Sequence, residues 1–524
     1  MAILLPLVGL GALTVLYVWQ LWRTRLPPGT KRLPGPSGWP IIGNVLDLPD
    51  QFPWLKFHEY ITTYGPIVQL NLLGQNHILL GTERVVDDLV RARGAIYSGR
   101  PQTEAASMLT QDMHILLMTQ SKGLRDRRAI LAKLLSRSAV SQYESSQWLE
   151  TYRMIRDIVQ NPPEYEEIFE HWTTAMGSRM LYGRAMHKRD AYQTEINIVS
   201  RLAVSIVKPG TYLVDFMPWM RYLPGIIAPW KRRFKALAHR DEAFYYKMWN
   251  KTREDLDDGT DAPSFTRRYI EDYGSEGGKG NLTEVEAVHL MGVTYTAFGT
   301  SSRNMNTFLF AMTRHPEWWS RITDEMESIV GGKRLPTLDD LSSLPILRAV
   351  LSEITRLWPV TPGGVPHLLT KDDVYQGYYL PAGSVIHLVT WSCGRDAELY
   401  PDPESFKPER WLEPGYPSYK EPLSEFPTLN NTLMFGAGRR QCPGMLVGMR
   451  NVYIQVMMLV WACDITRARD ANGEEIVPGK HEFVPGFNVH PKPFNFDLKA
   501  RSAERMAMVE RQYEKALAAD VMRE

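Results

Sequence analysis

The chain has 524 residues, of which 44% are hydrophobic and 23% charged, proportions that are ordinary for a globular protein. Its 60 basic and 59 acidic side chains leave a net charge of +1, so there is no basic excess to bind a nucleic-acid backbone, and no nucleic-acid partner is expected. The three cysteines, without a CxxC pair or a Cys/His cluster, exclude a disulfide framework and do not suggest a zinc site.

The first 22 residues contain no charged side chain. As a helix rising about 1.5 Å per residue they would span about 33 Å, enough to cross the hydrocarbon core of a bilayer. A cleaved signal peptide would need a positive start and a shorter apolar stretch, and this segment has neither. Basic residues follow at Arg23, Arg25, Lys31 and Arg32. The positive-inside rule therefore predicts one transmembrane anchor, residues 1–22, with the rest of the chain in the cytosol.

Residues 23–43 are basic and rich in proline, which predicts a stiff, extended hinge rather than a helix. From residue 57 onward, short β-type runs with turn residues appear, and most of the remainder has helical periodicity. The length alone would allow about three domains. Because no internal repeat or long low-complexity linker follows the hinge, residues 44–524 are predicted to form one large catalytic domain.

The longest helical candidate lies within residues 282–319 and contains no proline before Pro316. Thr283 and Glu286 form a capping-box pattern at its start, and Pro316 marks its end. About thirty residues at 1.5 Å each would cross roughly 45 Å. Gly292 and Gly299, with the threonines and serines around them, suggest that something passes close to the backbone. The alternative is a helix whose hydroxyls bond back to its own carbonyls.

A second helix is predicted over residues 345–359, where apolar residues recur at the spacing of one buried face: Leu347, Val350, Leu351, Ile354 and Leu357. Glu353 and Arg356 are neighbours on the surface of this helix. As an exposed ion pair they would contribute about a few tenths of a kcal/mol to its stability. Residues 378–391 predict two strands around a Pro-Ala-Gly turn. Residues 406–411, FKPERW, follow as an irregular piece.

Cys442 lies in the sequence LMFGAGRRQCPGMLVG, residues 433–448, which crowds glycines and arginines around it. Cys393 and Cys463 are instead expected to be small buried side chains. The loop could supply what an iron-bound thiolate needs: backbone N–H groups near the sulfur, glycines that let the chain approach a flat cofactor, and a cation at Arg440. A helix starting near Gly444 would place its N-terminus beside the anionic sulfur. A reactive or buried cysteine in a tight turn is the alternative.

Phe435, Gly438, Arg440, Cys442 and Gly444 reproduce the pattern F-x-x-G-x-R-x-C-x-G. In this the chain resembles the cytochrome P-450 superfamily of haem-thiolate monooxygenases, and the resemblance extends over nearly the whole chain. It implies a mainly α fold with a smaller β portion, as a single large haem domain behind an N-terminal transmembrane helix. The segments SEITR and PERW are similar to the family's E-x-x-R and PERF elements, which implies a structural cluster of Glu353, Arg356 and Arg410.

The resemblance implies haem as the cofactor, with Cys442 as the axial ligand of the iron and Phe435 and Gly438 in the cofactor-binding loop. It also implies that Arg440, His367 and Arg128 meet the haem propionates. His367 could instead be a turn residue.

The chain departs from the family pattern at Leu124, which stands where a tryptophan donor to a propionate is usual. Arg125 or Arg127 could substitute for that donor.

The resemblance also implies that Thr300 is the catalytic residue on the oxygen side. The family usually carries an acid immediately before this threonine, and here Gly299 stands in its place. That acid is thought to relay protons to dioxygen. Its absence leaves proton delivery to hydroxyls and water, or indicates chemistry that depends on the acid less.

The chain is therefore expected to be a monooxygenase in the endoplasmic reticulum membrane. It would use O2 and electrons from an NADPH-dependent reductase to oxidise a small lipophilic substrate. The sequences of its motifs are most similar to those of microsomal enzymes of fungi, often enzymes that modify natural products. Two alternatives stay open: a reductase-independent isomerase, dehydratase or peroxide-using enzyme, and a membrane-tethered haem sensor or carrier.

Overall fold

The structure is a computed structural model that describes residues 26–187, 194–195, 212–216, 218–259, 262–274, 282–430 and 432–522. The chain divides into two compact units. The first contains the described residues up to Pro101 with Thr361–Asp396 and Phe435–Gln441, and the second contains Gln102–Val360, Ala397–Met434 and the described residues from Cys442 onward. The predicted anchor, residues 1–22, lies outside the described residues, and the division into anchor, hinge and catalytic domain stays a prediction.

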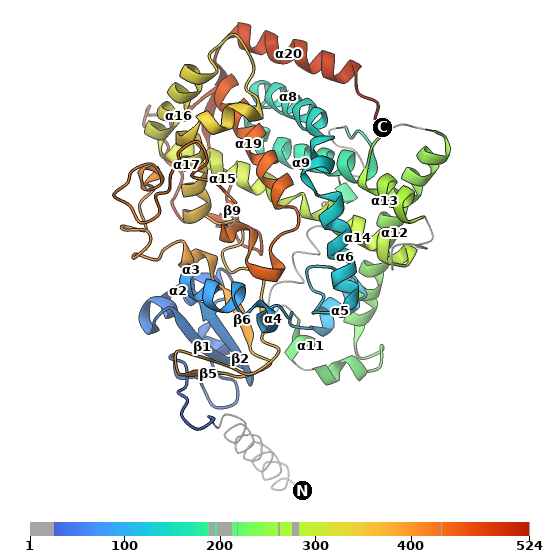
Figure 1. Cartoon of the computed structure of the whole chain (residues 1–524), viewed down its shortest axis with the longest axis vertical. Helices are drawn as coiled ribbons and strands as arrows, with labels where there is room; N and C mark the ends of the chain where they lie inside the picture. The colour runs from blue at the N-terminus through green and yellow to red at the C-terminus, as the bar shows by residue number, and fades with distance from the viewer. Residues whose placement is uncertain are drawn as a thin grey trace. The chain divides into compact units, whose positions relative to one another are not determined.

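The first unit is built on a four-stranded sheet with the order β1-β2-β6-β3. β1 (Ile67–Leu72) and β2 (Gln75–Leu80) form an antiparallel pair, β6 (Val385–Leu388) runs parallel to β2, and β3 (His367–Leu368) is antiparallel to β6. Figure 1 shows β1 and β2 in blue beside β6. The predicted β-type runs are confirmed, except that residues 57–64 belong to the helix α2 (Pro53–Tyr64).

The turn at residues 381–384 joins two strands that do not pair with each other. β5 (Tyr378–Leu380) pairs with β4 (Asp373–Tyr375), whereas β6 joins the four-stranded sheet. The remaining elements of this unit are short: η1 (Val45–Asp47), α3 (Glu83–Val86), η2 (Asp87–Arg91), α4 (Gly94–Tyr97), α18 (Thr390–Cys393) and η8 (Gly438–Arg440), with η7 (Leu433–Phe435) at the boundary.

The described part of the predicted hinge, residues 26–43, contains no helix, as its prolines predict. It is bonded to the β-strands of the first unit. The Lys31 N–H donates to the Gly377 carbonyl at 2.8 Å, and the Gln69 N–H donates to the Pro34 carbonyl at 2.9 Å. This segment is therefore an extended strap on the first unit.

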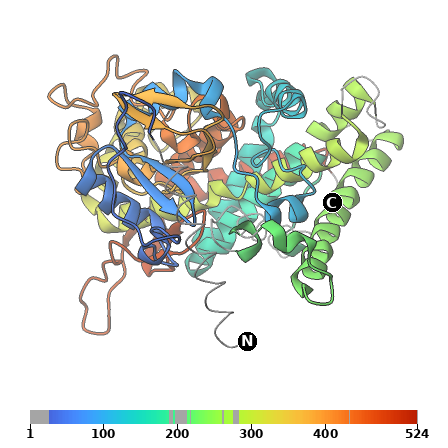
Figure 2. The same ribbon diagram turned by 90° about the horizontal axis from the view of Figure 1, so that it is seen from below.

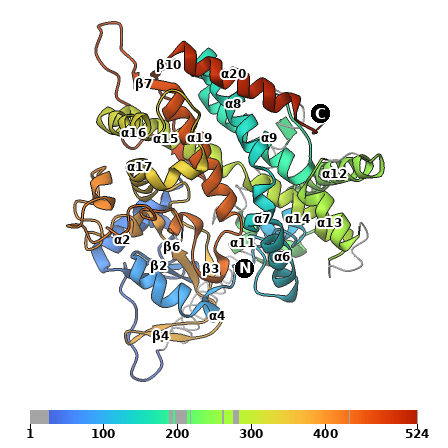
Figure 3. The ribbon, with the colours of Figure 1, turned by 45° about the horizontal axis from the view of Figure 1, so that its top comes forward.

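The second unit is mainly helical, which confirms the predicted mainly α fold with a smaller β portion but does not test the predicted N-terminal transmembrane helix. Its central helices are α8 (Glu144–Gln160), α9 (Tyr165–Tyr182), α15 (Thr300–Arg314), α17 (Pro345–Leu357) and α19 (Met445–Ala462). Figure 3 labels these helices, and Figure 2 shows the long α12 (Pro229–Asp257) in green. The others are α5 (Glu104–Thr110), α6 (Lys122–Leu134), α7 (Arg137–Ser141), η3 (Pro162–Glu164), α11 (Leu213–Phe216), η4 (Pro218–Tyr222), α13 (Phe265–Tyr273), α14 (Glu284–Ala297), α16 (Pro316–Ile329), η5 (Leu338–Ser343) and η6 (Pro408–Trp411).

The C-terminal part of the second unit adds two small sheets and a helix. β7 (Cys463–Arg467) pairs with β10 (Phe496–Ala500), and β8 (Phe483–Val484) pairs with β9 (His490–Pro491), both antiparallel. α20 (Ala503–Ala518) then packs along α8, as Figure 3 shows in dark red and teal. Beyond it, the Asp520 carboxylate pairs with the fully buried Arg179 at 2.7 Å.

The prediction of one long helix over residues 282–319 is wrong, because the segment forms α14 and α15 with a break at Phe298–Gly299. The capping box at Thr283 and the helix end before Pro316 are confirmed. At the break, the N–H groups of Phe298 and Gly299 bond three residues back, to Tyr295 and Thr296, in a tighter turn than an α-helix.

The two glycines of this segment differ in their surroundings. A Cβ on Gly292 would lie 2.2 Å from the Tyr245 ring, so a side chain does pass close to the backbone there. A Cβ on Gly299 would meet only the Thr296 carbonyl, at 3.6 Å. Gly299 therefore leaves space at the break.

The predicted α17 is confirmed with its apolar face buried, but Glu353 and Arg356 are not an exposed pair. The Glu353 carboxylate accepts bonds from Arg356 at 2.7 and 2.8 Å, from the Arg410 Nε at 3.1 Å and from the Trp411 Nε1 at 3.0 Å. It also accepts the Lys407 N–H at 2.8 Å. The side chains of Glu353 and Arg410 are 0% exposed. This cluster fixes residues 407–411 to α17.

Among the described residues, one helix, α19, has the length and the mean hydropathy (1.3) of a membrane span. Because 78% of it is buried, we assign it to the core of the second unit.

Replacing Glu353 by Gln should lower the free energy of unfolding by about 3–5 kcal/mol, because it leaves two buried guanidinium groups without their carboxylate. Chemical denaturation followed by circular dichroism measures this. The matched control is Glu475→Gln, because the exposed Glu475 carboxylate also pairs with two arginines, Arg467 and Arg469, and each such surface pair should contribute less than about 1 kcal/mol. Equal costs for the two substitutions would contradict the assigned role of the cluster.

Candidate functional site

Cys442 directly precedes the first turn of α19, as the predicted helix start near Gly444 requires. Its side chain is exposed, whereas Cys393 and Cys463 are buried. The Gly444 N–H donates a hydrogen bond to the sulfur, and the Arg128 guanidinium lies close enough to favour the thiolate. Cys442 and Arg128 both belong to the second unit, which therefore brings together two of the predicted haem contacts.

The pKa of the Cys442 thiol is nevertheless raised, because surrounding protein atoms disfavour the thiolate more than Gly444 and Arg128 favour it. Protein atoms surround most of the sulfur, but one side of the thiol stays open to solvent. The Cys442 side chain is therefore still exposed. Metal coordination deprotonates a thiol, so iron would stabilise the sulfur as a thiolate here. An accessible sulfur with an N–H donor and a nearby cation fits the axial ligand of a haem.

The loop before Cys442 has the backbone conformation that its glycines predict. Gly436 and Gly438 have φ values of 72° and 61°, in the left-handed region. A Cβ on Gly438 would lie 2.4 Å from the Val90 carbonyl oxygen, so no other residue fits without a shift of the backbone. Phe435 lies at the end of the short helix η7 and is half-buried.

The first unit brings Arg440 and His367 together. The Arg440 Nε donates to the Ser98 carbonyl at 2.8 Å, and the His367 Nδ1 lies 2.8 Å from the Tyr97 carbonyl. That carbonyl can only accept, so Nδ1 carries a proton. Burial lowers the pKa of His367 well below its ordinary value, and the positive charges of Arg100 and Arg440 lower it further. A propionate brought to this group would raise that pKa again by its negative charge.

Arg100 was not predicted from the sequence. It is buried, and its guanidinium donates to the carbonyls of Val365 and Pro366 at 2.9 and 2.6 Å. Its charge acts on His367, so the first unit gathers two arginines around one buried histidine. A buried cluster of positive groups fits the carboxylates of a haem. No local signal distinguishes Arg100, because one arginine beside a proline is common in loops.

The structure separates the three candidate arginines of α6. Arg127 is buried, and its guanidinium already has partners within the protein. It pairs with Glu286 at 2.8 Å and donates to the Gly123 carbonyl at 3.2 Å. Arg125 is exposed. Arg128 is half-buried, and the charge of its guanidinium interacts with Cys442. Arg128 thus stays the propionate candidate from this helix, and Leu124 is a buried core residue.

Thr300 begins α15, immediately after the helix break. Its Oγ1 donates to the Ala297 carbonyl at 3.1 Å, and the Thr296 Oγ1 donates to the Val293 carbonyl at 2.8 Å. The hydroxyls therefore bond back to their own helix, as the alternative interpretation of this segment expected. Thr300 is half-buried, and no carboxylate precedes it. Its hydroxyl lies where helix hydrogen bonding is already interrupted.

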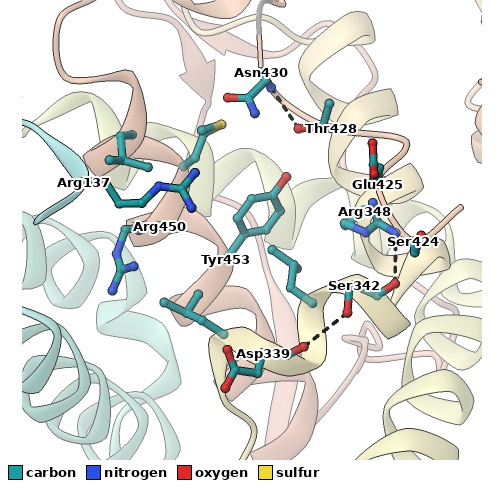
Figure 4. A pocket seen from close by; sticks show the side chains of 14 residues that line it. Arg137, Asp339, Ser342, Arg348, Ser424, Glu425, Thr428, Asn430, Arg450 and Tyr453 are labelled. Carbon is teal, nitrogen blue, oxygen red and sulfur yellow. Dashed lines mark hydrogen bonds between the residues drawn. The ribbon is translucent and has the colours of Figure 1, made fainter. Parts of the chain in front are cut away.

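A cavity of about 480 Å³ lies in the second unit beside the first turns of α19. Figure 4 shows Arg137 and Arg450 on one side of Tyr453, with Arg348 and Glu425 on the other. Arg348 is buried and donates to the Pro427 carbonyl at 2.9 Å, so it ties α17 to the following loop. Arg450 pairs with Glu144 at 2.7 Å, while Arg137 is exposed. No sequence pattern predicted this cavity.

The chain is similar to known proteins of one family. A family model described as Cytochrome P-450 matches residues 33–497. A cytochrome P-450 monooxygenase from Armillaria gallica is 32% identical over 98% of this chain and 96% of its own length. Another from Ampulloclitocybe clavipes is 32% identical over 96% and 92%, respectively. A zebrafish cytochrome P-450 solved with abiraterone is similar in fold, with a TM-score of 0.68, 20% identity, and coverage of 86% of this chain and all of that one.

Cys442→Ser should abolish the thiolate-type absorption band of the reduced carbonyl complex, because a serine hydroxyl cannot replace a thiolate as ligand. Cys393→Ser and Cys463→Ser are the matched controls and should keep that band, since both cysteines are buried away from solvent. Absorption spectra of the purified, reduced proteins under carbon monoxide measure this. Retention of the band in Cys442→Ser would show that another residue binds the iron.

Proposed function

The chain belongs to the cytochrome P-450 family of haem-thiolate monooxygenases, and we propose that it oxidises a small lipophilic substrate at the cytosolic face of the endoplasmic reticulum. One oxygen atom of O2 would enter the substrate and the other would leave as water, with two electrons from NADPH through a reductase and two protons. The observation that carries the proposal is the exposed Cys442 thiol beside Gly444 and Arg128.

When bound, haem would supply the redox chemistry of oxygen activation, and a thiolate of the protein would hold its iron. In this chain, Cys442 would be that thiolate. Arg128, Arg440 and His367 would bind the propionates by charge-assisted hydrogen bonds. Gly438 and Phe435 would shape the loop at the cofactor. These residues hold and orient the group, while the rest of the protein positions the substrate.

Thr300 would hold a water on the oxygen side and pass protons from it. Because Gly299 offers no carboxylate, this route consists of hydroxyls and water alone. The break at Phe298–Gly299 supports the role, since carbonyls in an interrupted helix can bond to water. A fungal natural-product intermediate is the proposed substrate, and the fungal origin of the relatives supports that choice.

The electron donor would approach the surface near the first turns of α19, because Cys442 directly precedes this helix. Arg137 and Arg450 line the cavity there, and Arg137 is exposed. The exposed positive charge of Arg137 would attract an acidic reductase surface and raise the association rate.

Apolar side chains at residues 219–227 support membrane attachment of the second unit. Trp219, Tyr222, Ile226 and Ile227 are all exposed, and Ile226 is 91% exposed. Exposed apolar clusters of this kind mark contacts with a membrane or a partner. This surface would add to the proposed anchor at residues 1–22.

A peroxide-using or otherwise reductase-independent enzyme is the second candidate, because the usual acid is missing at Gly299. Turnover of a lipophilic metabolite panel with NADPH and reductase, compared with peroxide alone or no oxidant, separates the two. The proposal expects product with NADPH and reductase. Product only without reductase would support the second candidate.

Arg137→Glu should slow reductase-driven reduction of the iron about three- to tenfold at low ionic strength, because it reverses the charge at the proposed docking surface. Stopped-flow formation of the reduced carbonyl complex measures this rate. Arg469→Glu, at another exposed arginine, is the control and should have little effect. An equal rate in Arg137→Glu and wild type would place docking elsewhere.

Thr300→Ala should divert reduced oxygen to peroxide and lower product per NADPH several-fold, because alanine cannot hold or pass a proton. Haem content should stay normal, since Thr300 bonds only within its own helix segment among the described residues. Product and peroxide per NADPH consumed are measured for both proteins. Equal coupling would show that protons arrive by another route and would favour the second candidate.

Deleting residues 2–22 should release much of the protein from microsomal membranes, with residual binding through residues 219–227. Adding Ile226→Ser should reduce that residual binding, whereas Val521→Ser, at an exposed site elsewhere, should not. Protein in the pellet after salt and alkaline extraction is measured. Unchanged resistance of the deletion variant to both treatments would contradict a single anchor.

A further inference from the structure

α12 presents a buried stripe that includes Phe234, Ala238, Tyr245 and Met248. Asp241 has the helical position between Ala238 and Tyr245 on this stripe, and it is half-buried. Within the described part of the chain, its carboxylate makes no hydrogen bond or ion pair, and burial raises its pKa to about 7. A polar group in an apolar stripe costs stability unless a partner binds it.

The same region of α12 contacts His289 of α14. The two rings of Tyr245 and His289 meet edge to face, with centroids 5.6 Å apart. Tyr245 is held in place by Gly292, where a Cβ would lie 2.2 Å from its ring. His289 is only 5% exposed, and its Nε2 has no hydrogen-bond partner among the residues that the structure describes. A buried ring nitrogen without a partner can accept a hydrogen bond from a ligand or donate one to it.

His114 approaches His289 from the segment between α5 and α6, and the two rings are close enough to influence each other electrostatically. The His114 Nδ1 accepts the Leu116 N–H at 3.3 Å, so its proton lies on Nε2 and that nitrogen is a donor. Burial lowers the pKa of His114 to about 4 and also lowers that of His289. Both rings are therefore neutral at pH 7.

The surroundings disfavour a charged ligand. The cation that acts on His289, Arg127, is engaged by Glu286 at 2.8 Å, so it is not available for a carboxylate. Glu242 and Arg127 act on His289 with charges of opposite sign, so the site favours neither an anion nor an ammonium group. A neutral hydroxyl can both donate to one imidazole and accept from the other, and apolar neighbours suit a hydrocarbon skeleton.

We propose that His289 and His114 bind a hydroxyl group of the substrate, which makes this a recognition site for lipophilic alcohols. This inference rests on the proposed monooxygenase function and narrows its substrate class. Asp241, one turn from Tyr245 on α12, is a second acceptor on the same face. His289 and His114 are specificity-determining residues.

The test measures binding to the haem-loaded enzyme by equilibrium dialysis, with two matched pairs of probes. These are 1-dodecanol with its methyl ether, and farnesol with its methyl ether. Methylation removes the hydroxyl donor and keeps the skeleton. In the wild type, at least one alcohol should bind about five- to tenfold more tightly than its ether. No preference in either pair would overturn the proposal.

His289→Phe and His114→Phe should each remove most of that preference by weakening alcohol binding, while ether binding stays within about twofold. His289→Asn keeps a hydrogen-bonding group and should restore part of the preference for the alcohol. This variant also keeps the proposal testable if His289→Phe does not fold. His239→Phe is the control, because His239 is an exposed histidine of α12. An equal loss of alcohol and ether binding in the His289 and His114 variants, or a matching loss in the control, would overturn the proposal.

The carbonyl spectrum and the NADPH-driven turnover of the same wild-type sample separate this inference from the proposed function. Alcohol preference without a thiolate-type spectrum or reductase-driven turnover would refute only the proposed function. A normal spectrum and turnover without alcohol preference would refute only this inference.

Discussion

The Glu353 carboxylate is the constraint on which the helical core of the second unit depends. It accepts two bonds from Arg356 in its own helix and three from Lys407, Arg410 and Trp411. A buried carboxylate needs such partners, because without them its desolvation would cost several kcal/mol. The cluster joins α17 to residues 407–411, and the Arg348 guanidinium extends that connection to the loop at Pro427. The irregular segment before α19 is thus fixed to helices at two points.

Fixing the segment before α19 is important for the candidate site, because the candidate functional residues lie in irregular backbone. Cys442 lies just before α19, Gly438 needs a left-handed conformation, and Thr300 follows a helix break. The sulfur receives an N–H bond from Gly444 and the field of Arg128, both of which favour its anionic form. In the first unit, Arg440 and Arg100 act on the buried His367. The chemistry of both sets of residues fits a haem, the cofactor of the family to which the chain belongs.

Two features would distinguish this chain from other members of its family. They are Gly299 and the polar groups on α12 and α14. Gly299 removes a carboxylate and leaves Thr300 with hydroxyls and backbone carbonyls as neighbours. Some ten residues earlier in the chain, His289 keeps a buried nitrogen that the described residues do not satisfy. The proposed proton delivery and the proposed substrate recognition would therefore both rely mainly on neutral groups. A lipophilic alcohol suits such surroundings better than an ion does, because a neutral ligand loses less hydration on burial.

The sequence by itself determined the features that depend on neighbours in the chain. Periodicity located α17 and its apolar face, the Thr283–Glu286 spacing located the start of α14, and the glycine turn singled out Cys442 among three cysteines. The same motif identified the family, because its residues lie within ten positions of one another. These are local patterns, and local backbone preferences are sufficient to produce them.

The tertiary structure alone decided which distant residues meet. It placed Glu353 against Arg410 and put β5 and β6 in different sheets. It also paired Glu286 with Arg127 rather than with Arg128. It also broke the long helix at Phe298, where continuous periodicity had predicted one element. No spacing rule links His114 to His289, which are far apart in the chain. Such contacts follow from how helices pack once apolar faces are buried, and a pattern read along one segment carries no information about the segment opposite.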